Sequence, residues 1–262
     1  MSLTGKTPAD TYKDIIYVDN NNSGVDSTVR AVKTGSGSST SIKTSDRSTI
    51  ITSSTDNTGA FFVQNSAEDI KFRVDTTNNQ VKALGTHINT QYAYFGVTSG
   101  LTTTYTTNTH YPLPFAGNNQ SAGLTDNFTL GTGTDPATSF TTADGATTDA
   151  SLIVGTLWYV PDNISIDGVH SLEGCDNATG GTTNMHLMSY TFNSGSTSAL
   201  ADGVLLAHNN DVTNAGSEQA YLSTWTVDSA AVVSGKVILA TFESSDATGD
   251  YSASVTVKYH LT

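Results

Sequence analysis

Short apolar runs separated by turn residues fill most of the first third of the chain. The runs predict β-strands at 29–32, 49–52, 60–64, 71–74 and 80–84, because strands are short, apolar and bounded by Gly, Asn, Asp and Ser. A helix start is present where Thr7 stands as N-cap before Pro8. The residues that follow, up to 18, predict either one or two helical turns or a short strand.

Residues 151–262 carry a stronger pattern. The nearly continuous apolar run at 151–160 predicts a central strand buried on both faces, and Asp167 with Gly168 predicts a turn. The final strand has an apolar residue at every second position: Tyr251, Ala253, Val255, Val257, Tyr259 and Leu261. Such alternation is typical of a half-buried antiparallel strand.

Seven or eight strands at this spacing predict an antiparallel β-sandwich of jelly-roll type in the C-terminal part. Its expected core residues are Trp158, Trp225, Val255, Val257 and Tyr259. For residues 86–150 we expect long loops with a few short strands. The fold class that follows is all-β, with few helical residues anywhere.

The first 85 residues are poor in large apolar side chains, with 21 such residues by count. A thin β segment of this kind cannot close a core on itself, because isolated hairpins are marginal in water. We therefore expect it to bury its apolar faces against copies of itself, as an oligomeric β shaft. The expected oligomer core of the shaft is Phe61, Phe62, Phe72, Val74 and Val81.

The charge of the chain changes near Gly85. Residues 1–85 carry nine Lys and Arg and nine Asp and Glu, whereas residues 86–262 carry two Lys and 15 acids, so that the second part holds the whole net charge of −13. This step predicts two parts, 1–85 and 86–262. An acidic surface nearly free of cations keeps particles apart, and salt screens it within about 8–10 Å.

The composition excludes several classes of protein. A single cysteine, Cys175, makes no internal disulfide, and no apolar run reaches the roughly 18 residues of a membrane span. The negative charge argues against a nucleic-acid partner, which requires clustered Lys and Arg. Residues 1–10 lack the apolar segment of a secretory signal, so we expect the protein to be made in the cytoplasm of the cell that produces it.

Motifs for catalysis and for metal binding are missing from the sequence. The six histidines show no pair at metal-ligand spacing: His87, His110, His170, His186, His208 and His260. Neither a phosphate-binding loop nor a nucleophile elbow is present. We expect no enzyme activity and no cofactor. Calcium on the acidic loops stays open as an alternative, although no Asp-x-Asp-x-Asp-Gly loop occurs.

Three segments resemble virion structural proteins of tailed bacteriophages, marine phages in particular. Residues 3–14, LTGKTPADTYKD, with the following Val18-Asp19-Asn20, are similar to N-termini of such proteins. Residues 52–81, with Phe-x-Val-Asp-Thr-Thr-Asn at 72–78, resemble a β repeat of fibre shafts. The stretches 157–161, 185–190 and 255–261 are similar to terminal β domains of the same class.

The resemblance implies a homotrimeric appendage that docks on the capsid or the tail through residues 1–85. The expected docking or oligomer-interface residues are Tyr12, Ile15, Ile16, Tyr17 and Val18. The acidic C-terminal knob would be displayed, either on a tail fibre that binds a host glycan or protein, or on a capsid fibre. A capsid decoration or cement protein is the first alternative.

A non-catalytic carbohydrate-binding module is a further alternative. It requires exposed aromatic side chains, for which the candidates are Tyr92, Tyr94, Tyr105 and Tyr111. A depolymerising tailspike is disfavoured, because the chain has neither the length nor the repeats of a large β-helix.

Overall fold

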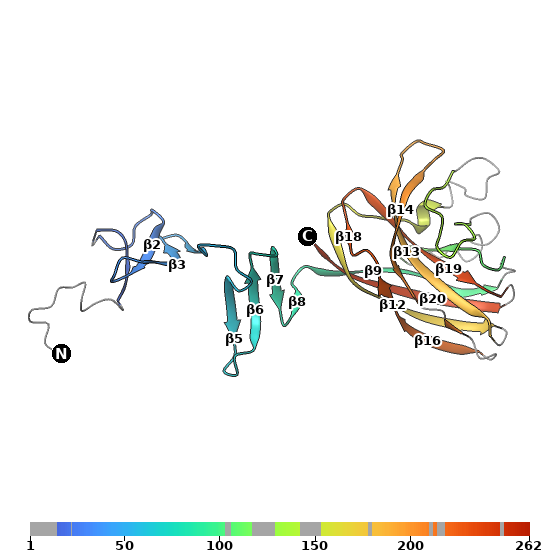
Figure 1. The fold of residues 1–262 in the computed structure, drawn as a ribbon, viewed down its shortest axis with the longest axis horizontal. Coiled ribbons are helices and arrows are strands. Elements are labelled where there is room, and N and C mark those ends of the chain that lie inside the picture. The colour runs from blue at the N-terminus through green and yellow to red at the C-terminus, as the bar shows by residue number, and fades with distance from the viewer. Residues whose placement is uncertain are drawn as a thin grey trace, which may run out of the picture. The chain divides into compact units, whose positions relative to one another are not determined.

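The computed structural model describes residues 15–21, 23–102, 106–116, 129–141, 153–177, 180–209, 212–213, 218–246 and 249–262. The fold is all-β, and every strand pairing among these residues is antiparallel. The chain divides into two compact units, Met1–Ile88 and Asn89–Thr262. We call them the N-terminal unit and the knob (Figure 1).

The N-terminal unit consists of two four-stranded sheets, each with its strands in chain order. The first sheet contains β1 (Ile16–Val18), β2 (Arg30–Thr34), β3 (Ser39–Thr44) and β4 (Thr49–Ile51). The second contains β5 (Phe61–Gln64), β6 (Ile70–Asp75), β7 (Gln80–Ala83) and β8 (Thr86–His87). Strand β3 escaped prediction because its sequence, STSIKT, has one apolar residue. The predicted helix start at Thr7 lies outside the described residues.

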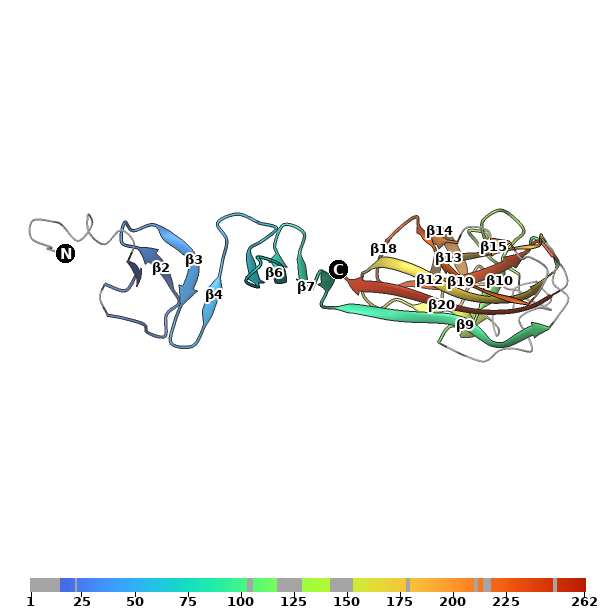
Figure 2. The same ribbon diagram turned by 90° about the horizontal axis from the view of Figure 1, so that it is seen from below.

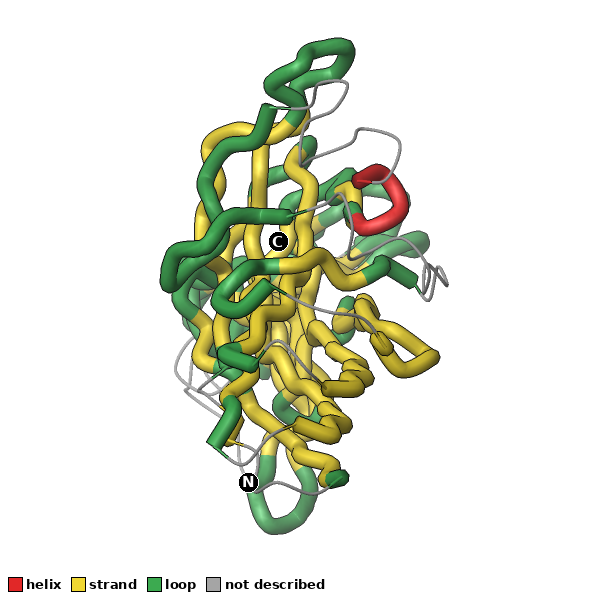
Figure 3. Tube along the Cα trace, turned by 90° about the vertical axis from the view of Figure 1, so that its right-hand side faces the viewer, coloured by secondary structure: helices red, strands yellow, loops and turns green. Residues whose placement is uncertain are grey.

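The knob is a sandwich of two sheets. Its strands are β9 (Thr90–Thr102), β10 (Tyr111–Leu113), β11 (Trp158–Tyr159), β12 (Ile164–Asn177), β13 (Thr182–Phe192), β14 (Leu200–His208), β15 (Val212–Thr213), β16 (Gln219–Thr224), β17 (Thr226–Val227), β18 (Ala231–Val232), β19 (Lys236–Ser244) and β20 (Gly249–Leu261). A short 3-10 helix, η1 (Val154–Thr156), is the red segment in Figure 3.

The strand order is that of a jelly roll. Sheet I runs β16-β12-β20-β9 with β18 beside β12, and sheet II runs β10-β19-β13-β14-β17 with β11 and β15 at its margins. The eight main strands follow one another along the chain in the order β9, β10, β12, β13, β14, β16, β19 and β20. When they are numbered 1 to 8 in this order, sheet I reads 6-3-8-1 and sheet II reads 2-7-4-5. This is the arrangement of two interlocking Greek keys. Figure 2 shows the long strands β9, β20 and β12 of sheet I side by side.

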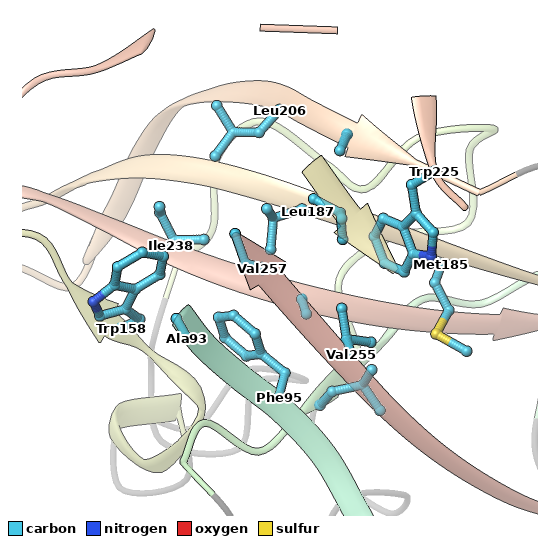
Figure 4. Close-up of a cluster of buried hydrophobic side chains, with 14 of the residues drawn as sticks. Ala93, Phe95, Trp158, Met185, Leu187, Leu206, Trp225, Ile238, Val255 and Val257 are labelled. Atoms are coloured by element: carbon cyan, nitrogen blue, oxygen red, sulfur yellow. The ribbon is translucent and has the colours of Figure 1, made fainter. Parts of the chain in front are cut away.

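The main core lies between the two sheets. Figure 4 shows side chains of β9 and β20 pointing toward those of β13 and β19. All five residues expected in the core are buried there: Trp158, Trp225, Val255, Val257 and Tyr259. A second apolar cluster covers the outer side of sheet II, where Leu130, Phe140 and Ile153 pack on Met188 and Tyr190.

Two predictions for the middle of the chain are wrong. Residues 86–150 contain the long strand β9, where long loops and short strands were expected. Its outward side chains include Tyr92 and Tyr94, which are aromatic and not polar, so the alternation of apolar and polar residues that indicates a half-buried strand is missing. Of the run predicted as a central strand at 151–160, the described residues 153–160 contain η1 and the two-residue strand β11 at the margin of sheet II. Their apolar side chains are needed in both clusters, with Ile153 in the outer one and Trp158 in the main core, and Gly155 lies where the chain bends between them.

The turn predicted at Asp167 and Gly168 is also wrong. Strand β12 continues through both residues, and its pairing with β20 shifts between Ile166 and Gly168. Asp167 is the extra residue of a β-bulge, and its carboxylate lies 2.9 Å from Nδ1 of His260 on β20. A bulge keeps the strand in the sheet where a turn would end it.

We predict that Gly96→Ala destabilises the knob by about 2 kcal/mol, because added atoms in a closely packed strand pair force the backbone apart. A Cβ at Gly96 would lie 2.4 Å from the carbonyl oxygen of Ala253 on the neighbouring strand. Gly168→Ala is the matched control, since its Cβ would meet only Nε2 of His170 at 3.8 Å. Urea unfolding followed by tryptophan fluorescence compares the two variants, and equal midpoints would contradict the steric argument.

Candidate functional site

The N-terminal unit exposes its apolar side chains. Among its described residues no hydrophobic side chain is buried, and the buried ones are polar: Asn20, Ser45 and Asp75. The large exposed side chains are Ile15, Ile16, Tyr17, Val25, Val29, Ile42, Ile50, Ile51, Phe61, Phe62, Val63, Ile70, Leu84 and Ile88. Exposed apolar surface of this extent marks an interaction site in a soluble protein.

The residues expected in the shaft and in docking differ in their exposure. Phe61 and Phe62 are exposed, whereas Phe72, Val74 and Val81 are half-buried. A hollow between β4 and β5 is lined by Ile51, Phe61 and Val74, among others. Of the docking residues, Ile15, Ile16 and Tyr17 are exposed, Val18 is half-buried, and Tyr12 lies outside the described residues.

Two short ion pairs lie beside the first sheet of the N-terminal unit. Nη2 of Arg30 lies 2.9 Å from a carboxylate oxygen of Asp26, and this hydrogen bond, with one from the Thr28 amide, lowers the pKa of Asp26 to about 2. Lys33 pairs with Asp19 at 2.7 Å. These pairs hold the loop between β1 and β2.

The outer side of sheet I is the second exposed surface, and we call it the open face. It consists of the outward side chains at 92–96 of β9, 168–174 of β12, 220–224 of β16 and 252–258 of β20. Cross-strand neighbours place Leu222 beside Leu172, Leu172 beside Ser254, and Thr256 beside Tyr94. Leu222 is 74% exposed, Leu172 61%, and Tyr92 and Tyr94 are each 53% exposed.

The aromatic candidates for carbohydrate binding separate in the structure. Tyr92 and Tyr94 lie on the open face, Tyr111 is buried in the main core, and Tyr105 lies outside the described residues. Tyr111 is therefore excluded as a ligand-stacking platform, and the prediction was wrong for that residue. Leu172 and Leu222 were missed, although Tyr221 and Leu222 side by side already indicate a strand that is apolar on both faces.

A buried polar network connects the two sheets. The Glu173 side chain is 4% exposed on the inner side of β12 and accepts hydrogen bonds from Oγ of Ser171 at 2.6 Å, Oγ1 of Thr183 at 3.2 Å and Nδ2 of Asn209 at 3.1 Å. Nε1 of Trp225 donates to Oγ of Ser171 at 2.8 Å. Because three side chains from different strands and loops donate to this buried carboxylate, its role is to hold the two sheets together.

Three histidines that are far apart in the sequence meet on the outer side of sheet II. His186 on β13 lies opposite His208 on β14 and opposite Thr241 on β19. The ring centroids of His110 and His186 are 5.0 Å apart, and those of His186 and His208 are 6.5 Å apart. We call His110, His186 and His208 the histidine cluster.

Burial determines the chemistry of the histidine cluster. Burial, with the neighbouring His110 and His208, lowers the pKa of His186 to about 3. Nε2 of His110 lies 2.8 Å from the carbonyl oxygen of Gly133 and donates to it. Among the described residues, the buried side-chain atoms without a hydrogen-bond partner are Nδ1 of His110, Nδ1 of His186, Oδ1 of Asn184 and Oγ1 of Thr241.

These groups do not form a metal centre. The carboxylate of Asp135 faces Nε2 of His186 at 3.6 Å. The nitrogen without a partner is Nδ1, on the other side of the ring. Carboxylate and lone pair therefore point to different places, whereas a zinc site needs three or four ligands around one point.

Comparison with known proteins gives little guidance. No protein-family model matches the chain. No curated protein matches it. Among solved structures, the CBM22-1 and GH10 modules of the N-terminal endo-1,4-β-D-xylanase 10B of Clostridium thermocellum, complexed with xylohexaose, match 40% of this chain at 17% identity and a TM-score of 0.22. The chain covers 17% of that protein, and a match at this TM-score says nothing about fold or function.

In the part of the chain that the structure describes, no helix has the length and hydrophobicity needed to cross a membrane.

Proposed function

We propose that this chain is a subunit of a homotrimeric bacteriophage appendage. The N-terminal unit forms the shaft and docks on the virion, and the acidic knob is displayed. The observation that carries the proposal is the set of apolar side chains that the N-terminal unit leaves exposed. The resemblance of residues 3–14 and 52–81 to phage virion proteins supplies the biological setting.

The energetics favour association of the N-terminal unit with copies of itself. Full burial of a Val, Leu, Ile or Phe side chain contributes about 1.5–3 kcal/mol. The exposed side chains of this unit lie on both of its sheets, from Ile42 and Ile51 in the first to Phe62 and Val63 in the second. Partners along the whole unit are needed to cover them, and parallel copies of the same unit meet that requirement.

The knob supports display in preference to catalysis. The buried Glu173 carboxylate and the histidine cluster are both involved in packing, and in the described part of the knob neither is joined by a nucleophile and a base in a cleft. Its surface is acidic, with 15 carboxylic residues against two lysines in 86–262. A tail fibre that contacts the host and a capsid fibre or decoration protein both use a knob of this kind, and electron microscopy of the particle separates these locations.

The native mass of the full chain tests the proposal. We expect a species of about 82 kDa, three times the chain mass of 27.4 kDa, in native mass spectrometry and in sedimentation. We expect Phe62→Ser to promote dissociation of this species on dilution, since each 1.4 kcal/mol lost changes the dissociation constant about tenfold.

Lys43→Ser is the matched control for Phe62→Ser, because Lys43 is an exposed residue of the same unit. It should leave the dissociation midpoint unchanged. A wild-type protein that stays at 27.4 kDa at micromolar concentration would end the appendage proposal. A trimer that Phe62→Ser does not weaken would show that the apolar surface of the N-terminal unit is not the interface.

A further inference from the structure

We infer that the open face of the knob is a second contact between copies of this chain, so that the three knobs form a closed ring with their open faces buried. The inference rests on the proposed function, which supplies the copies. The inference states which surface of the knob makes the contact and how the copies are arranged. The exposed apolar side chains of the N-terminal unit give no information on either point.

The open face is the uncovered side of the sandwich. The outer side of sheet II is covered by the chain's own residues, among them Leu130, Phe140 and Ile153. The outer side of sheet I also carries large apolar residues, Leu172 and Leu222, but these are mostly exposed. Two large apolar residues and two tyrosines on one sheet face have the composition of an interface core, in which aromatic residues are enriched and acidic residues depleted.

Charge identifies a second copy as the occupant. In the four ranges of the open face the only carboxylate is Glu173, whose side chain points into the core. Lys258, one of the two lysines after residue 85, lies in one of these ranges. On so acidic a domain, copies repel one another wherever acidic surfaces meet. A face without outward carboxylates lets identical knobs approach closely.

The shape of the open face fits a ring of copies. Tyr92 and Tyr94 protrude from the edge strand β9. Toward the opposite edge the small residues Gly174, Ala220 and Ser252 line a shallow hollow beside Leu172. A protruding part and a hollow at different places on one face combine head to tail, so that the β9 edge of one knob lies in the hollow of the next. Three such contacts close a ring when the rotation is threefold.

Hydroxyl-radical footprinting of the full-length protein tests the inference directly. Tyr159, which is 61% exposed on β11 and outside the open face, serves as an internal reference. An unpartnered knob should oxidise Tyr92 and Tyr94 about as fast as Tyr159, because their exposed fractions are similar. We expect Tyr92 and Tyr94 to be protected several-fold relative to Tyr159.

A carboxylate introduced into the face provides the matched variant. Leu222→Asp should raise the oxidation of Tyr92 and Tyr94 to the rate of Tyr159, because each contact of the ring would then bury a carboxylate without a partner. Val204→Asp, at an exposed position of sheet II, should leave the protection intact. Tryptophan fluorescence of both variants verifies that the knob is folded.

Native mass measured on the same samples separates this inference from the proposed function. A trimer with a protected open face supports both. A trimer whose tyrosines oxidise like Tyr159 overturns the ring of knobs and leaves the shaft-based appendage standing, with the face open to a different partner such as a host glycan. A monomer overturns both.

Discussion

Replacing Glu173 with alanine is expected to lower the free energy of unfolding of the knob by about 3–5 kcal/mol. The carboxylate accepts hydrogen bonds from Ser171, Thr183 and Asn209 in the interior of the sandwich. Removing it leaves these donors buried without an acceptor, and each unsatisfied donor costs about 1–3 kcal/mol. The change also opens a cavity between the two sheets, which adds to the cost.

The measurement uses the position of the tryptophans. Trp158 and Trp225 are the only tryptophans of the chain, and both are buried in the knob. Urea unfolding followed by their fluorescence therefore reports on the knob, provided that all samples have the same protein concentration. Because Trp225 donates to Ser171, the variant should also show a changed emission maximum before unfolding.

Glu173→Gln separates the role of the hydrogen bonds from that of the charge. The amide keeps one oxygen acceptor in the same place, and the hydroxyl of Thr183 can turn to accept from the new NH₂ group. We expect this variant to lose about 1–2 kcal/mol. Glu218→Ala, at an exposed position before β16, should stay within about 0.5 kcal/mol of the wild type. An alanine variant at residue 173 as stable as the Glu218 control would show that the network does not support the sandwich.

The jelly roll was predictable because period-two alternation indicates which strands are half-buried. Residues 251–261 alternate without a break, and β20 carries these residues in the centre of sheet I. The apolar run at 151–160 was misread for a related reason. Continuous hydrophobicity shows that a segment is buried on two sides, but it does not distinguish a central strand from a short segment that serves two clusters.

The surfaces on which the proposals depend need the register between strands. Leu172 and Leu222 are distant in the sequence, and only the pairing of β12 with β16 brings them together on one face. The histidine cluster needs two further pairings, of β13 with β14 and with β19. Local sequence patterns contain no information on such pairings, so the sequence indicated the kind of sandwich and left its sites hidden.

The exposure of apolar residues in the N-terminal unit, unlike the surfaces of the knob, was predictable without the register between strands. The small number of apolar residues predicted that this segment lacks a core of its own. The described residues of the N-terminal unit bury polar groups such as Asp75 but no hydrophobic side chain. The local sequence pattern was sufficient for this prediction, because the prediction concerned the number of apolar side chains and not the positions that strand pairing gives them. Whether copies of the chain cover that surface is tested by the native mass.

Acidification is expected to destabilise the knob through His186. In the folded knob the pKa of His186 is lowered from 6.5 to about 3, first by burial and then by His110 and His208. The unfolded chain therefore binds a proton near pH 6.5 that the folded knob excludes. This contribution to stability is fully present above pH 6.5 and is lost as the pH falls toward 3. Between pH 7 and pH 4.5 the loss is about 2–3 kcal/mol, at roughly 1.4 kcal/mol per pH unit below 6.5.

His186→Gln isolates this effect, because glutamine is polar and does not titrate. The groups facing His186 are His110, His208, Thr241 and the Asp135 carboxylate, which lies 3.6 Å from Nε2 and is mostly exposed. The variant should lose about 2–3 kcal/mol less than the wild type between pH 7 and pH 4.5 in fluorescence-detected urea unfolding.

His170→Gln, on the open face, should keep the wild-type pH dependence. The difference between the His186 variant and the His170 control is the decisive quantity, because each variant lacks one histidine. Equal losses in both would mean that His186 becomes protonated in the folded knob without cost, and that the histidine cluster is not a source of acid sensitivity.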